Sequence, residues 1–167
     1  AMPKIAAEFA AIPVRRVPKV KVGVVGEIYI KYSPLGNNNL EQFLLSEGAE
    51  PVVPGLTDFM IFKIFNRESD VDLYGGKWIK KKVCQIFKGY IEECQKAMIA
   101  ALKKPRFHAP GTFENMHKLV HGYLGDGNKM GEGWLLTAEM LELIHSGTNN
   151  IVCTQPFGCL PNHIVGK

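Results

Sequence analysis

Hydrophobic positions along the chain follow two different periods, and the changes between them outline the elements of the fold. Short runs rich in β-branched residues predict buried strands, whereas apolar residues spaced three or four apart predict amphipathic helices. Three runs predict strands, at residues 20–25, 51–53 and 150–153. Helical spacing covers residues 40–47, 57–74, 77–102, 113–121 and 132–145, and a further helix is expected to begin at Asn162.

The first two strands and the helix between them, residues 20–54, form a compact pattern with short links. Gly26 ends the first strand, the asparagines at 37–39 offer N-caps to the helix, and Gly48 ends that helix. This pattern predicts a right-handed crossover between two parallel strands. With the third strand on the other side of the first, the sheet has the order 2-1-3.

The order 2-1-3 also predicts where a ligand would bind. The chain winds one way from the first strand to the second, and then returns past the first strand to the third. Ligands of open α/β sheets bind beyond the carboxyl ends of the strands at which the winding reverses. That crevice would lie between the loop at residues 27–36 and the loop at residues 154–161.

The longest predicted helix follows the Gly75-Gly76 turn and forms a long helical insertion between the second and third strands. Its apolar positions recur every three or four residues and are Ile79, Val83, Ile86, Phe87, Tyr90, Ile91, Cys94, Met98 and Leu102. Cys84 and Cys94 lie ten residues apart, off one another's face, so we interpret both as packing residues. The lysines from Lys77 to Lys88 are interpreted as a solvated face.

Charge changes this picture only at the N-terminus. The 167 residues carry 20 Lys and Arg against 16 Asp and Glu, a formal net charge of +4. Residues 1–21 hold five of the basic residues and one acid, and the rest of the chain holds 15 of each sign. Residues 1–19, with three prolines, predict a linker arm, in which Ala1-Met2 is typical of an expression remnant. Residues 20–167 predict one α/β domain that continues beyond Lys167, and their balanced charge argues against a nucleic-acid partner.

The bulk composition narrows the class of protein further. With 46% hydrophobic and 22% charged residues, the chain has the composition of a folded domain. No apolar run approaches the ~18–20 residues that a membrane span needs. Four cysteines in 167 residues do not make a disulfide framework. These features predict a cytoplasmic, reducing location without membrane association.

Two thiols, Cys153 and Cys159, flank the turn after the third predicted strand. A thiolate beside a helix N-terminus is stabilised by the helix dipole, which favours metal or iron–sulfur ligation or redox chemistry. The alternative is one strand cysteine and one incidental loop cysteine, because this spacing is not that of a standard zinc or ferredoxin site. The pattern alone leaves both open.

The loop on the other side of the predicted crevice, at residues 27–36, is long for a link between a strand and a helix. It carries a carboxylate, aromatic rings and a cation, among them Glu27, Tyr29 and Lys31. A binding loop and a simple packed loop are both consistent with this composition.

Two further patterns give weaker signals. The glycine-rich segment at residues 125–133 could cradle an anion, but it lacks the Lys-Ser/Thr of a P-loop and a preceding strand, so a flexible turn is favoured. His117 and His121 have the i, i+4 spacing of zinc ligands, but no third ligand is evident and Lys118 stands where a metalloprotease would have Glu. We therefore interpret both histidines as ordinary helix residues.

Three longer segments stand out as motifs: VGVVGEIYIKYSPLGNNNLEQFLLSEGAEPV, GEGWLLTAEM and NNIVCTQPFGCLPNHIVGK. Together they resemble a conserved region of the large acyl-CoA dehydratase activase-related proteins, the 2-hydroxyglutaryl-CoA dehydratase/activator-like family. Members of that family join ATPase modules, which are CoA-substrate-specific enzyme activases, to modules like the dehydratase itself. The resemblance covers residues 20–167.

More distantly, the region is similar to the C-terminal domain of 2-hydroxyacyl-CoA dehydratase subunits, a flavodoxin-like and Rossmann-like α/β domain. That domain helps to hold a [4Fe-4S] cluster through cysteines in the loops after strands. The resemblance implies Cys159 as a cluster ligand, with Cys153 as the weaker candidate, and Glu27, Tyr29 and Lys31 as residues that line the pocket. The dehydratases also carry a cysteine after the first strand of this domain, which is absent here, so further ligands would have to come from elsewhere.

Three functions are consistent with these patterns. The first is a module of a 2-hydroxyacyl-CoA dehydratase/activase-like iron–sulfur system, with the ATPase-like and dehydratase-like modules of the same polypeptide as its partners. The second is a non-catalytic docking or scaffold domain, which predicts a homo-oligomer or binding to an adjacent module. The third is a metal-free domain that binds acyl-CoA esters. Under each of them we expect no turnover from the isolated chain.

Overall fold

The computed structural model describes residues 1–103 and 107–166. The chain divides into two compact units. The helical unit comprises Ala1–Val17 and Leu56–Asn115, and the sheet unit comprises Pro18–Gly55 and the chain from Met116 onward. This division differs from the expected arm over 1–19 and single domain over 20–167, because the N-terminal segment packs against the long helix of the helical unit.

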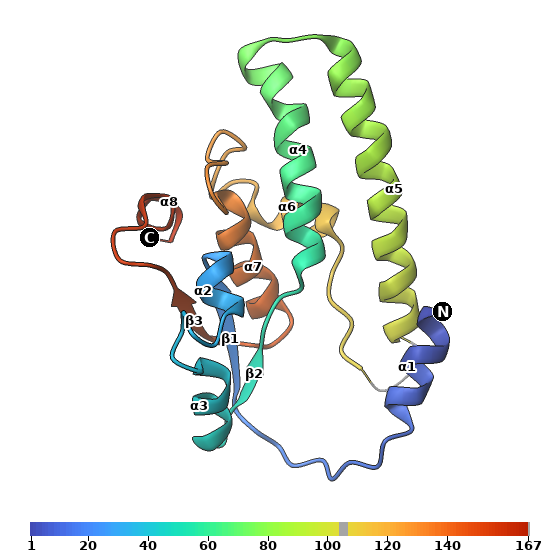
Figure 1. The fold of residues 1–167 in the computed structure, drawn as a ribbon, viewed down its shortest axis with the longest axis vertical. Coiled ribbons are helices and arrows are strands. Elements are labelled where there is room, and N and C mark those ends of the chain that lie inside the picture. The colour runs from blue at the N-terminus through green and yellow to red at the C-terminus, as the bar shows by residue number, and fades with distance from the viewer. Residues whose placement is uncertain (104–106, 167) are drawn as a thin grey trace. The chain divides into compact units, whose positions relative to one another are not determined.

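The sheet unit is built on three parallel strands, β1 (Lys21–Gly26), β2 (Glu50–Val52) and β3 (Asn150–Thr154), in the order β2-β1-β3 (Figure 1). The expected order 2-1-3 is therefore confirmed. β1 is the central strand, and its residues Val24 and Val25 are fully buried. The register places Val25 beside Cys153 and Gly26 beside Thr154.

The carboxyl ends of β1 and β3 approach so closely that only glycine fits at position 26. Gly26 has a φ of +132°, and a Cβ atom there would lie 1.8 Å from the carbonyl oxygen of Thr154. The same carbonyl oxygen accepts a hydrogen bond of 2.9 Å from the N–H of Glu27. The chain thus leaves β1 in a backbone conformation that residues other than glycine rarely adopt.

The helices of the sheet unit include one that the sequence pattern did not predict. They are α2 (Ile28–Tyr32), α3 (Leu40–Ser46), α7 (Trp134–His145), α8 (Leu160–Val165) and the end of α6 (Phe113–Val120). The expected open loop at 27–36 was wrong over α2, because the Glu27 carboxylate accepts a hydrogen bond from the N–H of Ile30 and caps the turn. The side chain of Asn37 then accepts a bond from the N–H of Leu40, the first residue of α3.

Helix α7 packs against β1 and supplies much of the core of the sheet unit. One cluster of buried side chains joins Leu136 and Leu143 of α7 to Val25 of β1 and Val165 of α8. A helix that is apolar over most of its surface is expected to be buried, and α7 is buried over most of its length, although Ile144 near its end is exposed. Glu139 is a charged residue among its buried side chains.

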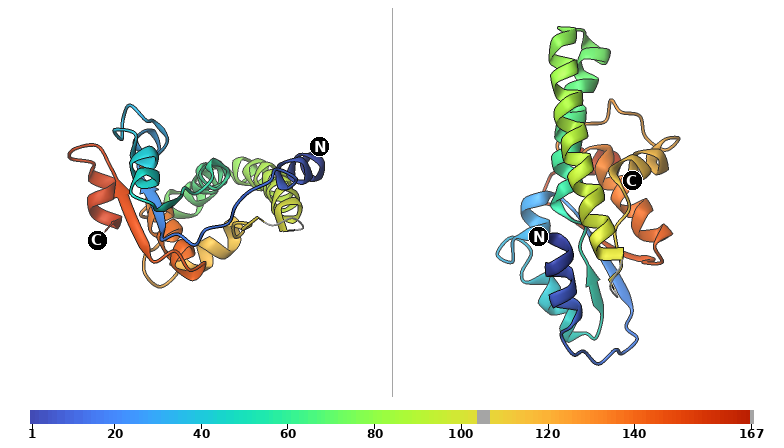
Figure 2. Two further views of the ribbon diagram at one scale, coloured as in Figure 1. Left: turned by 90° about the horizontal axis from the view of Figure 1, so that it is seen from below. Right: turned by 90° about the vertical axis from the view of Figure 1, so that its right-hand side faces the viewer.

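The helical unit contains α1 (Met2–Ala10), α4 (Leu56–Tyr74), α5 (Trp78–Lys103) and the start of α6. Helices α4 and α5 run side by side as a hairpin (Figure 2), joined at Gly75, whose φ is +79°. Helix α1 corrects the expectation of an arm over 1–19, since residues 2–10 are helical and contact α5. No helix within residues 1–103 and 107–166 is long and apolar enough to cross a membrane.

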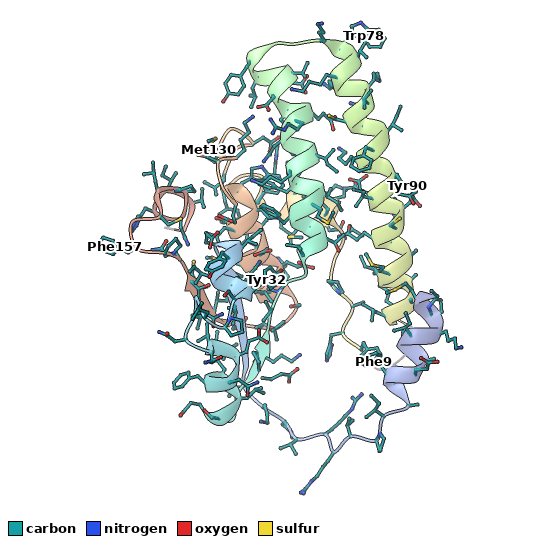
Figure 3. All side chains as sticks on the ribbon, in the orientation of Figure 1. Phe9, Tyr32, Trp78, Tyr90, Met130 and Phe157 are labelled. Atoms are coloured by element: carbon teal, nitrogen blue, oxygen red, sulfur yellow. The ribbon has the colours of Figure 1, made fainter. Side chains whose placement is uncertain are left out.

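The apolar stripe of α5 is exposed over its first half. Ile86 is 75% exposed and Tyr90 68%, and Figure 3 shows Tyr90 on the side of α5 that is turned away from α4. The buried positions of α5 are Gln95, Ile99 and Ala101 instead. Helical periodicity identifies an apolar face, but it does not show whether that face has a partner.

Replacing Gly26 tests the close approach of β1 and β3. Gly26→Ala is expected to lower the stability of the sheet unit by about 3 kcal/mol or more, because the new Cβ would clash with the Thr154 carbonyl in a strained conformation. The measurement is urea unfolding followed by the fluorescence of the buried Trp134 in a Trp78→Phe background. Gly55→Ala is the matched control, since a Cβ at Gly55 meets nothing within 4 Å, and equal losses in the two variants would contradict the interpretation.

Candidate functional site

The carboxyl edge of β1 and β3 is the point at which the winding of the sheet reverses. The chain passes from β1 to β2 on one side and arrives at β3 on the other. Two connections therefore diverge at this edge, one beginning at Glu27 and the other following Thr154. This is where ligands of open α/β sheets bind, so the described side chains around it form the candidate site.

The two cysteines of the predicted site both lie at this edge. Cys153 belongs to β3, and its thiol donates a hydrogen bond of 3.4 Å to Oδ1 of Asn162 on α8. Cys159 is the N-cap residue of α8 and is half-buried. The structure therefore brings both thiols to the end of one strand, six residues apart around an exposed turn.

The ionisation of Cys153 is shifted by its surroundings. Burial raises the pKa of the Cys153 thiol, and the nearby Cys159 and Glu139 act in the same direction, partly offset by the hydrogen bond with Asn162. In the absence of a cation, Cys153 is therefore a weaker nucleophile and ligand than an ordinary cysteine.

The turn between the cysteines projects an aromatic ring into solvent. Phe157 is fully exposed, at 108% of its reference surface, and Figure 3 shows it at the outer end of the loop between β3 and α8. Gly158 has a φ of +72°, and the N–H of Cys159 bonds to the carbonyl oxygen of Pro156. Phe157 therefore takes no part in the core of the sheet unit.

The residues expected to line the other side of the crevice have three different environments. Glu27 caps α2 through the N–H of Ile30 at 2.9 Å. Tyr29 is exposed. Lys31 is 3% exposed and does not face solvent. Their assignment to a ligand site stays a prediction.

Lys31 forms a buried ion pair with Glu139 of α7. Its Nζ lies 3.0 Å from both carboxylate oxygens, and each side chain is 3% exposed. The Nζ also lies 5.0 Å from the centroid of the Tyr32 ring. A second bond between the same segments runs from the N–H of Ile28 to Oε1 of Glu132, at 3.3 Å. These contacts tie α2 to α7 and to the segment that precedes it.

Two cavities adjoin α8 at this edge. One, of about 330 Å³, is lined by Cys153, Gln155, Asn162, His163 and Gly166. The other, of about 220 Å³, lies between the glycine-rich segment and α8, and its lining includes Met130, Leu160 and Ile164. Cys153 lines the first cavity, whereas Glu27, Tyr29 and Lys31 line neither.

The glycine-rich segment at residues 125–133 forms a turn that leads into α7. Gly133 has a φ of +49°, and a Cβ there would lie 2.2 Å from the carbonyl oxygen of Asn128. That oxygen accepts a bond of 2.7 Å from the N–H of Trp134 at the start of α7. The segment is therefore a closed turn that is constrained by the main chain and leads into α7, whereas the sequence pattern favoured a flexible turn.

The edge does not by itself fit a [4Fe-4S] cluster. Such a cluster takes four ligands, usually four thiolates. Within residues 1–103 and 107–166, the group of three or more metal-ligating side chains that the structure brings together contains no cysteine. Cys153 and Cys159 together would supply two ligands, so the chain holds at most half of a cluster site.

That group supplies a third ligand candidate for the histidines, which the sequence pattern did not show. His117 and His121 are joined by Asp126, and the three potential ligand atoms lie within 4.8 Å of one another. The third ligand escaped the sequence interpretation because Asp126 is brought back by a turn rather than by helix periodicity. The sequence does carry one signal for it, the glycine at position 122, whose φ is +104°.

Comparison with protein-family models, with curated protein sequences and with solved structures finds no match for this chain.

The buried pair can be tested by removing one partner and then both. Lys31→Met leaves the Glu139 carboxylate buried without its cation and is expected to lower the stability of the sheet unit by about 3–5 kcal/mol. The double variant Lys31→Met/Glu139→Met removes both charges and is expected to recover most of that loss. Urea unfolding measures both. A double variant as unstable as the sum of two single variants would show that the pair is not coupled.

The raised pKa of Cys153 predicts a slow and pH-shifted reaction with alkylating agents. With the other three cysteines replaced by Ser, the alkylation rate of the folded chain is expected to rise at higher pH than that of the same chain unfolded in urea, because less thiolate is present at a given pH. Stopped alkylation with mass spectrometry gives both profiles. A folded-state profile at or below the unfolded one would contradict the assignment.

Proposed function

We propose that this chain is a module of a 2-hydroxyacyl-CoA dehydratase/activase-like iron–sulfur system, and that it contributes Cys159, with Cys153, to a cluster site shared with another module. The support is the resemblance of its three motifs to the acyl-CoA dehydratase activase-related family. Those motifs are far apart in the sequence, yet all three belong to the sheet unit.

The contacts between the motifs are the observation that carries the proposal. The first motif contains Lys31 and the second contains Glu139, and these two residues form the buried ion pair. The first motif also contains Val25, which lies in register with Cys153 of the third. Segments that resemble one family region and that fold together around one strand edge are expected to serve one site.

The same proposal extends to the fold. Flavodoxin-like sheets have the strand order 2-1-3-4-5, and the observed order β2-β1-β3 agrees with its first three strands. We propose that this sheet is the beginning of a flavodoxin-like, Rossmann-like domain.

Cys159 is the better of the two ligand candidates on physical grounds. It stands at the first turn of α8 as the N-cap residue, whereas the Cys153 thiol donates a hydrogen bond to Asn162 and has a raised pKa, so that less of it is thiolate. The remaining ligands would come from a dehydratase-like module of the same polypeptide, next to an ATPase-like module. The exposed Phe157 and the exposed half of the α5 stripe are surfaces suited to such contacts.

We propose that the chain holds and orients the shared cluster. The substrate of the complete system would then be an acyl-CoA. We propose a cytoplasmic location, because cluster ligation needs reduced thiols. No step of turnover is assigned to the residues of this chain alone, in agreement with its incomplete ligand set.

Anaerobic reconstitution with iron and sulfide tests the proposal. A small thiol is added in excess, so that it can fill the positions the chain does not supply. The chain is expected to bind iron with the broad visible absorption of iron–thiolate charge transfer, and Cys159→Ser is expected to reduce the bound iron at least about tenfold, as the loss of a metal ligand should. Iron and sulfide analysis gives the measurement.

The matched control is the variant Cys84→Ser/Cys94→Ser, which removes the two thiols of α5 and should leave iron binding unchanged. Cys153→Ser is expected to have a smaller effect than Cys159→Ser. A chain that stays free of iron, or one that loses iron equally with either pair of cysteines, would contradict the proposal.

A further inference from the structure

A second group of potential ligands lies in the sheet unit and contains none of the residues of the proposed cluster edge. It consists of His117, His121 and Asp126. Two imidazoles and one carboxylate are ligands that divalent transition metals accept, zinc among them. Each ligand atom lies within 4.8 Å of the other two.

Local structure explains why these three side chains meet. His117 lies in α6, and His121 follows one residue after its end, so that the i, i+4 spacing places both rings on the same side. The ring centroids are 5.6 Å apart, in an edge-to-face arrangement. Gly122, with a φ of +104°, ends the helical path and turns the chain back. Asp126 then reaches His117, with Oδ1 at 2.8 Å from Nε2.

The group is held in place from two sides. The ring of His117 packs against the fully buried ring of Trp134, with centroids 4.9 Å apart. Asp126 lies within the turn that is closed by a bond of 3.0 Å from the N–H of Asn128 to the carbonyl oxygen of Gly125. Positioned ligands reduce the cost of ordering on metal binding. His121 is exposed, so the open side of the group is accessible from solvent.

The distances are near those that a metal ion requires. In a tetrahedral zinc site with bonds of about 2.0–2.1 Å, neighbouring ligand atoms lie roughly 3.3 Å apart. The His117–Asp126 pair is already slightly closer than this, at 2.8 Å, and the widest separation in the group, at most 4.8 Å, needs only a small side-chain rotation of the exposed His121. Binding would replace the proton shared by His117 and Asp126 with the cation.

We propose that His117, His121 and Asp126 form a binding site for one divalent transition metal ion of the zinc class. Three protein ligands leave a fourth position for water or for a ligand group, which is the arrangement of catalytic rather than structural zinc sites. This site is independent of the proposed function, because it uses none of the cysteines. The competing explanation is a hydrogen-bonded His–Asp pair with a neighbouring histidine and no metal.

Cobalt(II) titration of the chelator-treated chain distinguishes the two explanations. The titration is carried out in the Cys153→Ser/Cys159→Ser background, so that the thiols of the sheet edge cannot bind the ion. We expect one Co²⁺ per chain, with the visible d–d absorption of a low-coordinate nitrogen and oxygen site and without a thiolate band, and displacement by Zn²⁺. His121→Ala and Asp126→Asn are each expected to weaken binding at least about tenfold.

The matched control is His145→Ala, which removes an exposed helical histidine whose Nδ1 bonds only within its own helix, to the carbonyl oxygen of Leu141. It should leave the affinity unchanged. Thermal unfolding followed by Trp134 fluorescence gives a second readout: Zn²⁺ should raise the midpoint of the parent chain and not that of His121→Ala. Absence of Co²⁺ binding by the parent chain, or equal affinity in parent, His121→Ala and Asp126→Asn, would overturn the proposal.

Discussion

The sheet unit depends on the close approach of two backbones at the end of β1. Because Gly26 has no side chain, β1 and β3 stay paired to their last residues, and the Thr154 carbonyl can accept the N–H of Glu27. That bond starts the turn into α2, which in turn carries Lys31 inward to Glu139. The register that follows also sets Cys153 beside Val25. One missing side chain thus positions both connections of the candidate site.

The sheet could be predicted from the sequence because its strands are short, β-branched and separated by clear breaks. The pairing of β1 with β2 followed from the crossover pattern, and placing the first strand at the centre gave the order β2-β1-β3. The two short helices at residues 2–10 and 28–32 could not be predicted in this way. Helix α2 is one and a half turns long, too short for periodicity to register, and it is specified by the cap at Glu27. The stripe of α5 was predicted as a stripe, but its burial was not, because burial depends on a partner.

Some features of the candidate site could likewise be predicted from the sequence, and others could not. Adjacency of the Glu27 and Cys153 segments follows from strand order, so it could be predicted. The partner of Lys31 lies 108 residues away in the sequence, and Glu139 is one of two glutamates in the apolar helix α7, so the sequence did not show which of them is buried beside a cation. Asp126 is nine residues from His117, a separation that no regular helix brings into contact. Both contacts depend on tertiary packing and on turns at glycine, and helical periodicity predicts neither of these.

The interleaving of the two units has a consequence for how the chain folds. The bonds between β1 and β3 join residues up to 129 positions apart, whereas the α4–α5 hairpin closes through the short turn at Gly75. Loop-closure entropy opposes long-range pairing until much of the chain is already organised. The hairpin therefore has the topology of an early, locally formed structure. Once it has formed, the chain that links β2 to β3 is effectively shorter, and pairing β3 with the sheet costs less loop-closure entropy.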